Sequence, residues 1–391
     1  MFIQNLASCC FGILLLLFNM GSDQSFEKFV ESLKSISDSQ TKNQLIDQYL
    51  SGHNFPLVEH NRIHFIYRGK AKRVAVPGEL SQWDPSNAPM ERIQGTDFFY
   101  RNDSAPIDGR IEYKLWVDSA WIVDPLNQRQ AEGGFGFNSD LWMPQYRQID
   151  TNIFRSNIPH GTIDTFSLSS RYLDCSHPIL VYLPPKRSMT DSLPVIYVTD
   201  GGEYLSLGKM HFILDYLIAT HRIRPVCGVF VDPRKDLKKP STNMRMTEYS
   251  ADDAFLDFLQ FEVTPYIEQH YPVLSSPKNR AILGASMGGL ISTYTVLSRP
   301  DFINNSAAQS PSYTQAKSAV IKLAKKLDYI HSHIFIQTGT IGDTEVEAQQ
   351  VSTIISEKGG KLRYETFHEG HNWTNWRTHL PSILENFFPP R

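Results

Sequence analysis

The chain has 391 residues, a formal net charge of −3, a hydrophobic share of 41% and an aromatic share of 12%. This length predicts two domains, and this composition excludes an intrinsically disordered protein. The small net charge, without a basic stripe, also excludes a protein that binds nucleic acid through a positively charged surface.

The first segment, residues 1–22, resembles a signal peptide. Its apolar run from Phe11 to Phe18 is too short to span a bilayer, but it has the length of a signal-peptide core. Met1 to Asn5 contains no Lys or Arg, which is unusual for such a signal. We expect export to the periplasm or the medium, with a cytoplasmic protein as the alternative, and no stable membrane span in the mature chain.

Two small regions are expected next. Residues 23–52 carry apolar side chains at helical spacing on both sides of a Ser-Asp-Ser break, which predicts a helical hairpin. Residues 53–150 then change to period two and contain turn residues between short apolar runs, which predicts a β-sandwich. The expected strands are 63–67, 73–76, 98–100 and 111–116.

The rest of the chain, residues 155–391, alternates apolar strands with amphipathic helices. This alternation predicts an α/β fold with a mostly parallel sheet covered by helices on both faces. After two strand-like stretches near 163–168 and 179–183, the expected strands are 195–198, 226–231, 280–283, 333–336 and 362–367. The expected helices lie near 207–220, 254–270, 288–297, 316–326 and 345–357.

The cysteines and histidines do not predict a metal site or a cofactor. Only Cys175 and Cys227 lie beyond the signal segment, and two cysteines in a large domain are more often buried thiols than a disulfide. The run from His368 to His371 lacks the i, i+4 histidine spacing of a zinc-protease helix.

The strongest motif is Gly284-Ala285-Ser286-Met287-Gly288, a G-x-S-x-G sequence between an expected strand and an expected helix. In this context the motif is typical of a nucleophile elbow, where a sharp turn strains the serine backbone and leaves no space for side chains at the flanking glycines. We therefore predict that Ser286 is the catalytic nucleophile and that the fold is that of an α/β-hydrolase.

A serine nucleophile needs a base, and the base in this fold follows the acid along the chain. His371 follows the strand expected at 362–367, so we predict that it is the general base; His368, nearer the strand, is the competitor. Asp343 follows the preceding strand and is predicted to orient the imidazole, with Glu345 as the alternative. The oxyanion is expected to be held by the backbone amides of Met287 and Gly202, the latter chosen over Gly201.

Several of these runs together resemble one esterase family of α/β-hydrolases, which includes enterochelin, feruloyl and acetylxylan esterases and mycolyltransferases. The matching runs are Asp200 to Tyr204, Gly284 to Gly289, and Gly370 to Trp373 with Trp376-Arg377. Asn243 to Tyr249 after Val231 to Arg234 is similar to the enterochelin-esterase branch. Gly78 to Trp83, Glu112 to Lys114 and Val123 to Asn127 are similar to the immunoglobulin-like early-set domain of that branch. The family often has an acid where this chain has Gly342.

The resemblance implies a serine carboxylic-ester hydrolase that acts on a small-molecule ester, such as a ferric siderophore or a feruloylated sugar. It implies that Arg245, with Arg234 or Lys235, receives a negatively charged catecholate, and that Tyr204 and Trp373 contact the substrate. For Arg245, a salt bridge to Glu248 is an equal alternative. Acyl transfer to an acceptor other than water, and a non-catalytic binding protein on a hydrolase scaffold, are the rival functions.

Overall fold

The structure, a computed structural model, describes residues 25–154, 157–185 and 192–390. The chain divides into two compact units, one of residues 1–130 with 138–146 and one of residues 131–137 with 147–391. The segment predicted as a signal peptide, residues 1–22, lies outside the described residues, so export stays a prediction.

The first unit begins with a helical hairpin, α2 (Phe26–Ser35) and α3 (Ser39–Ser51). Asp38 caps α3 by accepting a hydrogen bond from the Thr41 amide at 2.7 Å. The apolar faces of both helices pack on buried side chains of the neighbouring sheet, so the hairpin shares one core with the strands. The residues of this core include Phe26, Phe29, Leu33, Ile46, Ile66, Phe98 and Tyr100.

Three small sheets follow the hairpin along the chain, and they are ordered β1-β2-β5-β4, β6-β10-β9 and β3-β7-β8. A fully buried arginine, Arg110, pairs with Glu112 at 2.8 Å and with Asp140 at 2.9 Å between β6 and β10. The strands are β1 (Leu57–Glu59), β2 (Arg62–Arg68), β3 (Val74–Ala75), β4 (Glu91–Arg92), β5 (Phe98–Ser104), β6 (Arg110–Tyr113), β7 (Leu115–Val117), β8 (Ala120–Ile122), β9 (Gln130–Gly133) and β10 (Gly136–Trp142). That these sheets form an immunoglobulin-like sandwich stays a prediction.

The second unit is built on an eight-stranded sheet ordered β11-β12-β14-β13-β15-β16-β17-β18. Its first three strands pair antiparallel and the rest of the sheet is parallel, so the sheet is mixed. The strands are β11 (Thr162–Ser170), β12 (Cys175–Leu183), β13 (Val195–Val198), β14 (Cys227–Val231), β15 (Arg280–Ala285), β16 (Asn305–Gln309), β17 (His333–Gly339) and β18 (Lys361–Phe367). The sequence did not predict β16.

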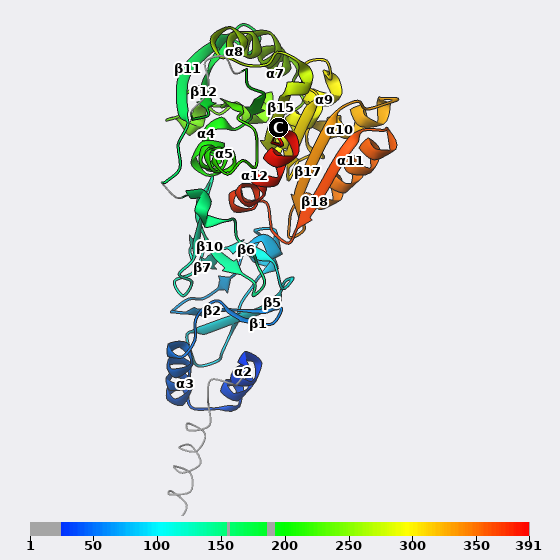
Figure 1. The fold of residues 1–391 in the computed structure, drawn as a ribbon. Helices are drawn as coiled ribbons and strands as arrows, with labels where there is room; N and C mark the ends of the chain where they lie inside the picture. The colour runs from blue at the N-terminus through cyan, green and yellow to red at the C-terminus, as the bar shows by residue number, and fades with distance from the viewer. Residues whose placement is uncertain (1–24, 155–156, 186–191, 391) are drawn as a thin grey trace, which may run out of the picture. The chain divides into compact units, whose positions relative to one another are not determined.

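Helices cover both faces of this sheet, as Figure 1 shows. One buried cluster contains side chains of α7 (Asp253–Phe258), α8 (Thr264–His270), α9 (Met287–Ser298), α10 (Gln315–Lys326) and α11 (Glu345–Glu357). The other contains side chains of α4 (Gly201–Ser206), α5 (Met210–Ala219) and α12 (Trp373–Phe387). The predicted α/β architecture is thus confirmed. Within the described ranges, no helix combines the length and the apolar character that a membrane crossing requires.

One half-buried histidine, His333, makes the stability of this unit depend on pH. Burial, with a smaller contribution from Lys361, lowers the pKa of His333 to about 4. The ring nitrogen Nε2 lies 3.3 Å from Asn386 Nδ2, an amide donor that requires a neutral acceptor. A histidine whose pKa is lower in the folded than in the unfolded state contributes stability above its unfolded pKa. That stability is lost as the pH falls, because only the unfolded chain takes up the proton.

We therefore expect His333→Gln to flatten the loss of stability between about pH 6.5 and pH 4. Urea unfolding at several pH values would measure the effect, with the variant of exposed His331, His331→Gln, as the control. Equal pH slopes for wild type and His333→Gln would contradict this role of His333.

Candidate active site

The residues singled out in the sequence gather at one edge of the large sheet. Because parallel strands end at the same edge, the loops that follow them meet there. Five such loops contribute: Thr199 to Gly202 after β13, Ser286 after β15, Ser310 to Ser312 after β16, Asp343 after β17 and His371 after β18. This edge is therefore the candidate active site.

Ser286 occupies the turn between β15 and α9 with a strained backbone, at φ 58° and ψ −120°. A Cβ atom at Gly284 would overlap Thr199 Oγ1 and the Gly288 backbone, and one at Gly288 would overlap the same hydroxyl. The two flanking glycines thus let the turn pass close to Thr199. This geometry is that of a nucleophile elbow.

Asp343 and His371 lie together, with 2.7 Å between Asp343 Oδ1 and His371 Nδ1. The other carboxylate oxygen of Asp343 accepts hydrogen bonds from the Gly339 amide at 2.7 Å and from Ser310 Oγ at 2.6 Å. The Asp343 side chain is fully buried, whereas about a third of the His371 side chain (34%) is exposed. Glu345, the alternative acid, begins helix α11. The geometry therefore favours Asp343 over Glu345 as the partner of the imidazole.

The segment from Gln309 to Ser312 links Ser286 to this pair. The Ser286 amide donates to the Gln309 carbonyl at 2.8 Å, and the Ser312 amide donates to the Ser286 carbonyl at 3.1 Å. Ser286 Oγ also shares a hydrogen bond of 3.1 Å with Ser312 Oγ, and Ser310 reaches Asp343 as described above. Sequence reasoning missed both serines because it did not predict the strand that precedes them.

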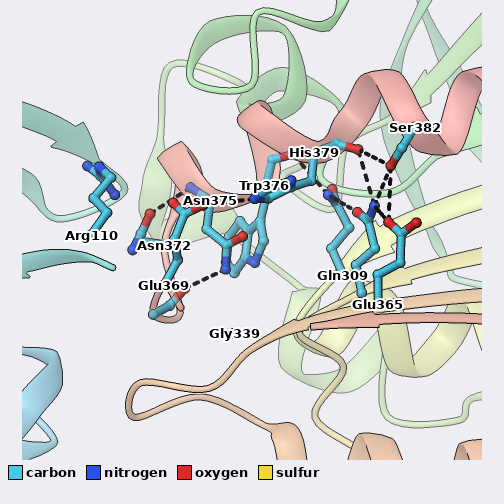
Figure 2. A network of polar contacts seen from close by, with 12 residues as sticks. Arg110, Gln309, Gly339, Glu365, Glu369, Asn372, Asn375, Trp376, His379 and Ser382 are labelled. Carbon is cyan, nitrogen blue, oxygen red and sulfur yellow. Dashed lines mark hydrogen bonds and ion pairs between the residues drawn. The ribbon is translucent and has the colours of Figure 1, made fainter. Parts of the chain in front are cut away.

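Helix α12 fixes the loop that carries His371 (Figure 2). Trp376 donates from Nε1 to Ser310 Oγ at 2.8 Å, and its ring meets the His371 ring edge-on with 5.1 Å between centroids. Gln309 Nε2 donates to the Trp376 carbonyl at 2.9 Å and to Gln337 Oε1 at 3.1 Å. These contacts join α12 to β16 and β17, so the position of the imidazole depends on the core of the unit.

The two expected oxyanion donors differ in their surroundings. Met287 begins α9 directly after Ser286, at the positive end of a helix dipole. The Gly202 amide, in contrast, donates to Asp232 Oδ2 at 2.8 Å, and the Arg234 side chain holds the same carboxylate. Its N–H is therefore engaged by a carboxylate in this structure, which does not favour the expected role of Gly202 as an oxyanion donor.

The expectation that Arg245 receives the substrate stays a prediction, but this side chain also has partners within the protein. Its guanidinium donates from Nε to Asp200 Oδ1 at 2.8 Å and from Nη2 to the Ala285 carbonyl at 2.9 Å. Glu248, the alternative partner, pairs with His177 instead. Arg245 therefore supports the backbone on both sides of the site, at Asp200 and just before Ser286.

Charges near the loop after β13, Thr199 to Gly202, are largely paired within the protein. Burial raises the pKa of Asp200, and the positive charge of Arg245 opposes this shift. Burial, and then the nearby Asp200, raises the pKa of Glu203. Arg234 is paired with Asp232 and Arg245 with Asp200, so each arginine already has a carboxylate partner within the protein. Lys235 is exposed.

Tyr204 and Trp373, the other expected substrate contacts, belong to the core. Tyr204 is fully buried, its hydroxyl donates to Gln309 Oε1 at 3.0 Å, and its ring meets that of Trp373 edge-on. Trp373 is 7% exposed. Tyr204 therefore has no surface to offer a ligand, and Trp373 has very little.

Replacing Gly284 with alanine tests the close approach at the elbow. We expect Gly284→Ala to lower the free energy of unfolding by about 3 kcal/mol or more, because the new methyl group overlaps backbone and Thr199. Gly52→Ala is the control, since its Cβ would meet only ordinary contacts at 3.7 Å. Chemical denaturation of both variants measures the difference, and equal stabilities would contradict the packing argument.

Comparison with curated proteins gives relatives that match half of the chain or more. An uncharacterized protein of Bacillus subtilis, YjcH, is 27% identical over 239 residues, which are 58% of this chain and 97% of YjcH. A siderophore triacetylfusarinine C esterase of Aspergillus fumigatus is 24% identical over 50% of this chain and 61% of its own length. An endo-1,4-beta-xylanase/feruloyl esterase of Xylanibacter ruminicola is 25% identical over 71% of this chain and 38% of its length.

Solved structures share the fold over a larger part of the chain. The ferric enterobactin esterase of Salmonella typhimurium matches with a TM-score of 0.71 and 18% identity, covering 86% of this chain and 95% of that one. The model of the family described as "Putative esterase" matches residues 170–387, which contain every residue of the candidate site. The chain therefore belongs to this esterase family.

Proposed function

We propose that this protein is a serine carboxylic-ester hydrolase that works through an acyl-enzyme on Ser286. The observation that carries the proposal is the strained Ser286 turn, joined through the segment from Gln309 to Ser312 to the buried Asp343 and its partner His371. A nucleophile, a base and an orienting acid at one edge of the sheet are the parts that this route of ester hydrolysis requires.

In the proposed reaction, His371 Nε2 takes the proton from Ser286 Oγ as this oxygen bonds to the ester carbonyl carbon. The alcohol leaves with that proton, and the acyl group stays on Ser286. A water molecule then attacks the acyl carbon, gives a proton to His371 and releases the acid, while the proton returns to Ser286. Asp343 holds Nδ1–H and stabilises the imidazolium that forms in both steps.

Before the first step, Ser286 Oγ must turn from Ser312 toward His371. Catalytic hydrogen bonds in ligand-free enzymes often tighten only when substrate binds, so the contact with Ser312 marks a resting position. The Met287 amide, at the start of α9, is the proposed donor to the oxyanion.

For the substrate, we propose an ester or lactone of a siderophore. The relative from Aspergillus fumigatus is named for this activity, and the fold is shared with enterobactin esterases over most of the chain. A feruloylated sugar is the second candidate, because the Xylanibacter ruminicola relative, named in part as a feruloyl esterase, matches 71% of this chain. We further propose that the first unit is an immunoglobulin-like early-set domain and that the protein is exported.

Hydrolysis of p-nitrophenyl acetate and butyrate tests the mechanism. We expect Ser286→Ala to lower kcat by about 10⁴-fold or more, and Asp343→Asn by roughly 10³- to 10⁴-fold, because the imidazole loses its orientation. Glu345→Gln is the matched control and should keep nearly full activity, because Asp343, and not Glu345, contacts His371. Wild-type rates in Ser286→Ala would refute the role of Ser286 as nucleophile, whereas no activity in either protein would favour a non-catalytic binding protein.

A second assay addresses the substrate. Wild-type protein and Ser286→Ala are compared on a cyclic catecholate lactone, with and without Fe³⁺, and on a feruloylated arabinose, with products separated by liquid chromatography. We expect kcat/KM to be highest on the lactone and absent in the variant. Higher kcat/KM on the feruloylated sugar would replace the siderophore assignment and leave the serine mechanism intact.

A further inference from the structure

Three side chains with metal-binding chemistry meet in the second unit, and the proposed ester chemistry uses none of them. Cys175 and His177 lie on β12, and Glu248 ends the short helix α6 (Arg245–Glu248). His177 Nε2 is 3.2 Å from Cys175 Sγ and 3.0 Å from Glu248 Oε1. All three ligand atoms lie within 4.8 Å of one another. A thiol, an imidazole and a carboxylate at these distances form a candidate metal site.

The fold places the three groups together for local reasons. Cys175 and His177 are two positions apart on a strand, so both side chains leave the same face of the sheet. His177 and Glu248 are buried, and Cys175 is partly exposed. The candidate metal site is therefore closed toward the core, and solvent can reach it from the side of Cys175.

The imidazole has the orientation that a metal ligand needs. Its Nδ1 lies 3.0 Å from the backbone carbonyl of Asp232, which can only accept a hydrogen bond, so Nδ1 carries a proton. Nε2 is thereby directed at Cys175 and Glu248. A hydrogen bond of this kind behind a metal-binding histidine fixes its tautomer and its ring orientation.

Glu248 supplies an independent observation. Its side chain is 3% exposed, and within the described part of the chain Oε2 is buried without a hydrogen-bond partner. A buried carboxylate oxygen that lacks a partner is costly, and native structures usually satisfy such atoms. A cation bound beside Nε2 would satisfy this oxygen.

We propose that Cys175, His177 and Glu248 bind Zn²⁺. Thiolate, imidazole and carboxylate are the ligands that Zn²⁺ takes in proteins, whereas Mg²⁺ and Ca²⁺ prefer oxygen ligands alone. Binding replaces the proton of the Cys175 thiol by the metal and releases that proton to solvent. Water completes the fourth position from the exposed side.

The bound ion would act as a structural support, without taking part in ester cleavage. Helix α6 carries Arg245, which donates hydrogen bonds to Asp200 and to the Ala285 carbonyl. Tyr249, the first residue after this helix, accepts a hydrogen bond from the Asp200 amide at 3.0 Å. Zn²⁺ would tie this helix to β12 and so stabilise the loop after β13.

The test uses the full chain, stripped with a chelator and then dialysed against Zn²⁺, with bound metal measured by mass spectrometry. We expect one Zn²⁺ per wild-type chain and a higher Tm with the metal than without it. Cys175→Ser and Glu248→Gln should weaken binding by at least about tenfold. Cys227→Ala, which changes the other described cysteine, is the control and should bind like wild type.

Cobalt gives a second readout that does not depend on activity. Co²⁺ in the wild-type protein should show a thiolate charge-transfer band that Cys175→Ser loses and Glu248→Gln keeps or shifts. Wild-type protein that retains no Zn²⁺ would overturn the proposal and leave His177 and Glu248 as a buried ion pair. Zn²⁺ binding unchanged in both variants would also overturn it, because the metal would then bind elsewhere.

Discussion

The close crossing of the Ser286 turn over Thr199 is the contact on which the rest of the site depends. Only residues without a Cβ fit at Gly284 and Gly288. Because glycine has no side chain, β15 can pair with β13 while the chain turns sharply into α9. The cost is a serine at positive φ, a conformation that persists only when its surroundings determine it. Neighbouring backbone supplies that support through hydrogen bonds to the amide and carbonyl of Ser286.

The loop after β16 extends this constraint to the base and its acid. One serine of the loop touches Ser286 and another touches Asp343, so a single short segment sets the separation between the two halves of the proposed triad. Its own anchors lie deep in the core, through Gln309 to the α12 backbone. Substitutions that change the packing of α12 should therefore shift the position of His371 even when the substituted residue does not contact it.

The sequence predicted what is encoded locally. The glycine spacing around Ser286 and the strand-by-strand order of Asp343 and His371 place these three residues at one edge without knowledge of any distant contact. What the sequence did not predict depends on contacts between distant residues or on an atypical strand. The Gly202 amide is engaged by Asp232, thirty residues further along the chain, and Arg245 is held by Asp200. Strand β16 was missed because its sequence, Asn-Ser-Ala-Ala-Gln, lacks the β-branched and aromatic residues typical of strands.

The exposure of His371 has a consequence for the lifetime of an acyl-enzyme. About a third of this side chain (34%) faces solvent, while its partner Asp343 is fully buried. Water would thus have direct access to the imidazole that activates it for attack on an acyl group attached to Ser286. Any other acceptor of the acyl group must compete with this water by binding beside the imidazole. For the proposed acyl-enzyme, such an open site would favour hydrolysis, and synthesis of a new ester would require a partner that covers His371.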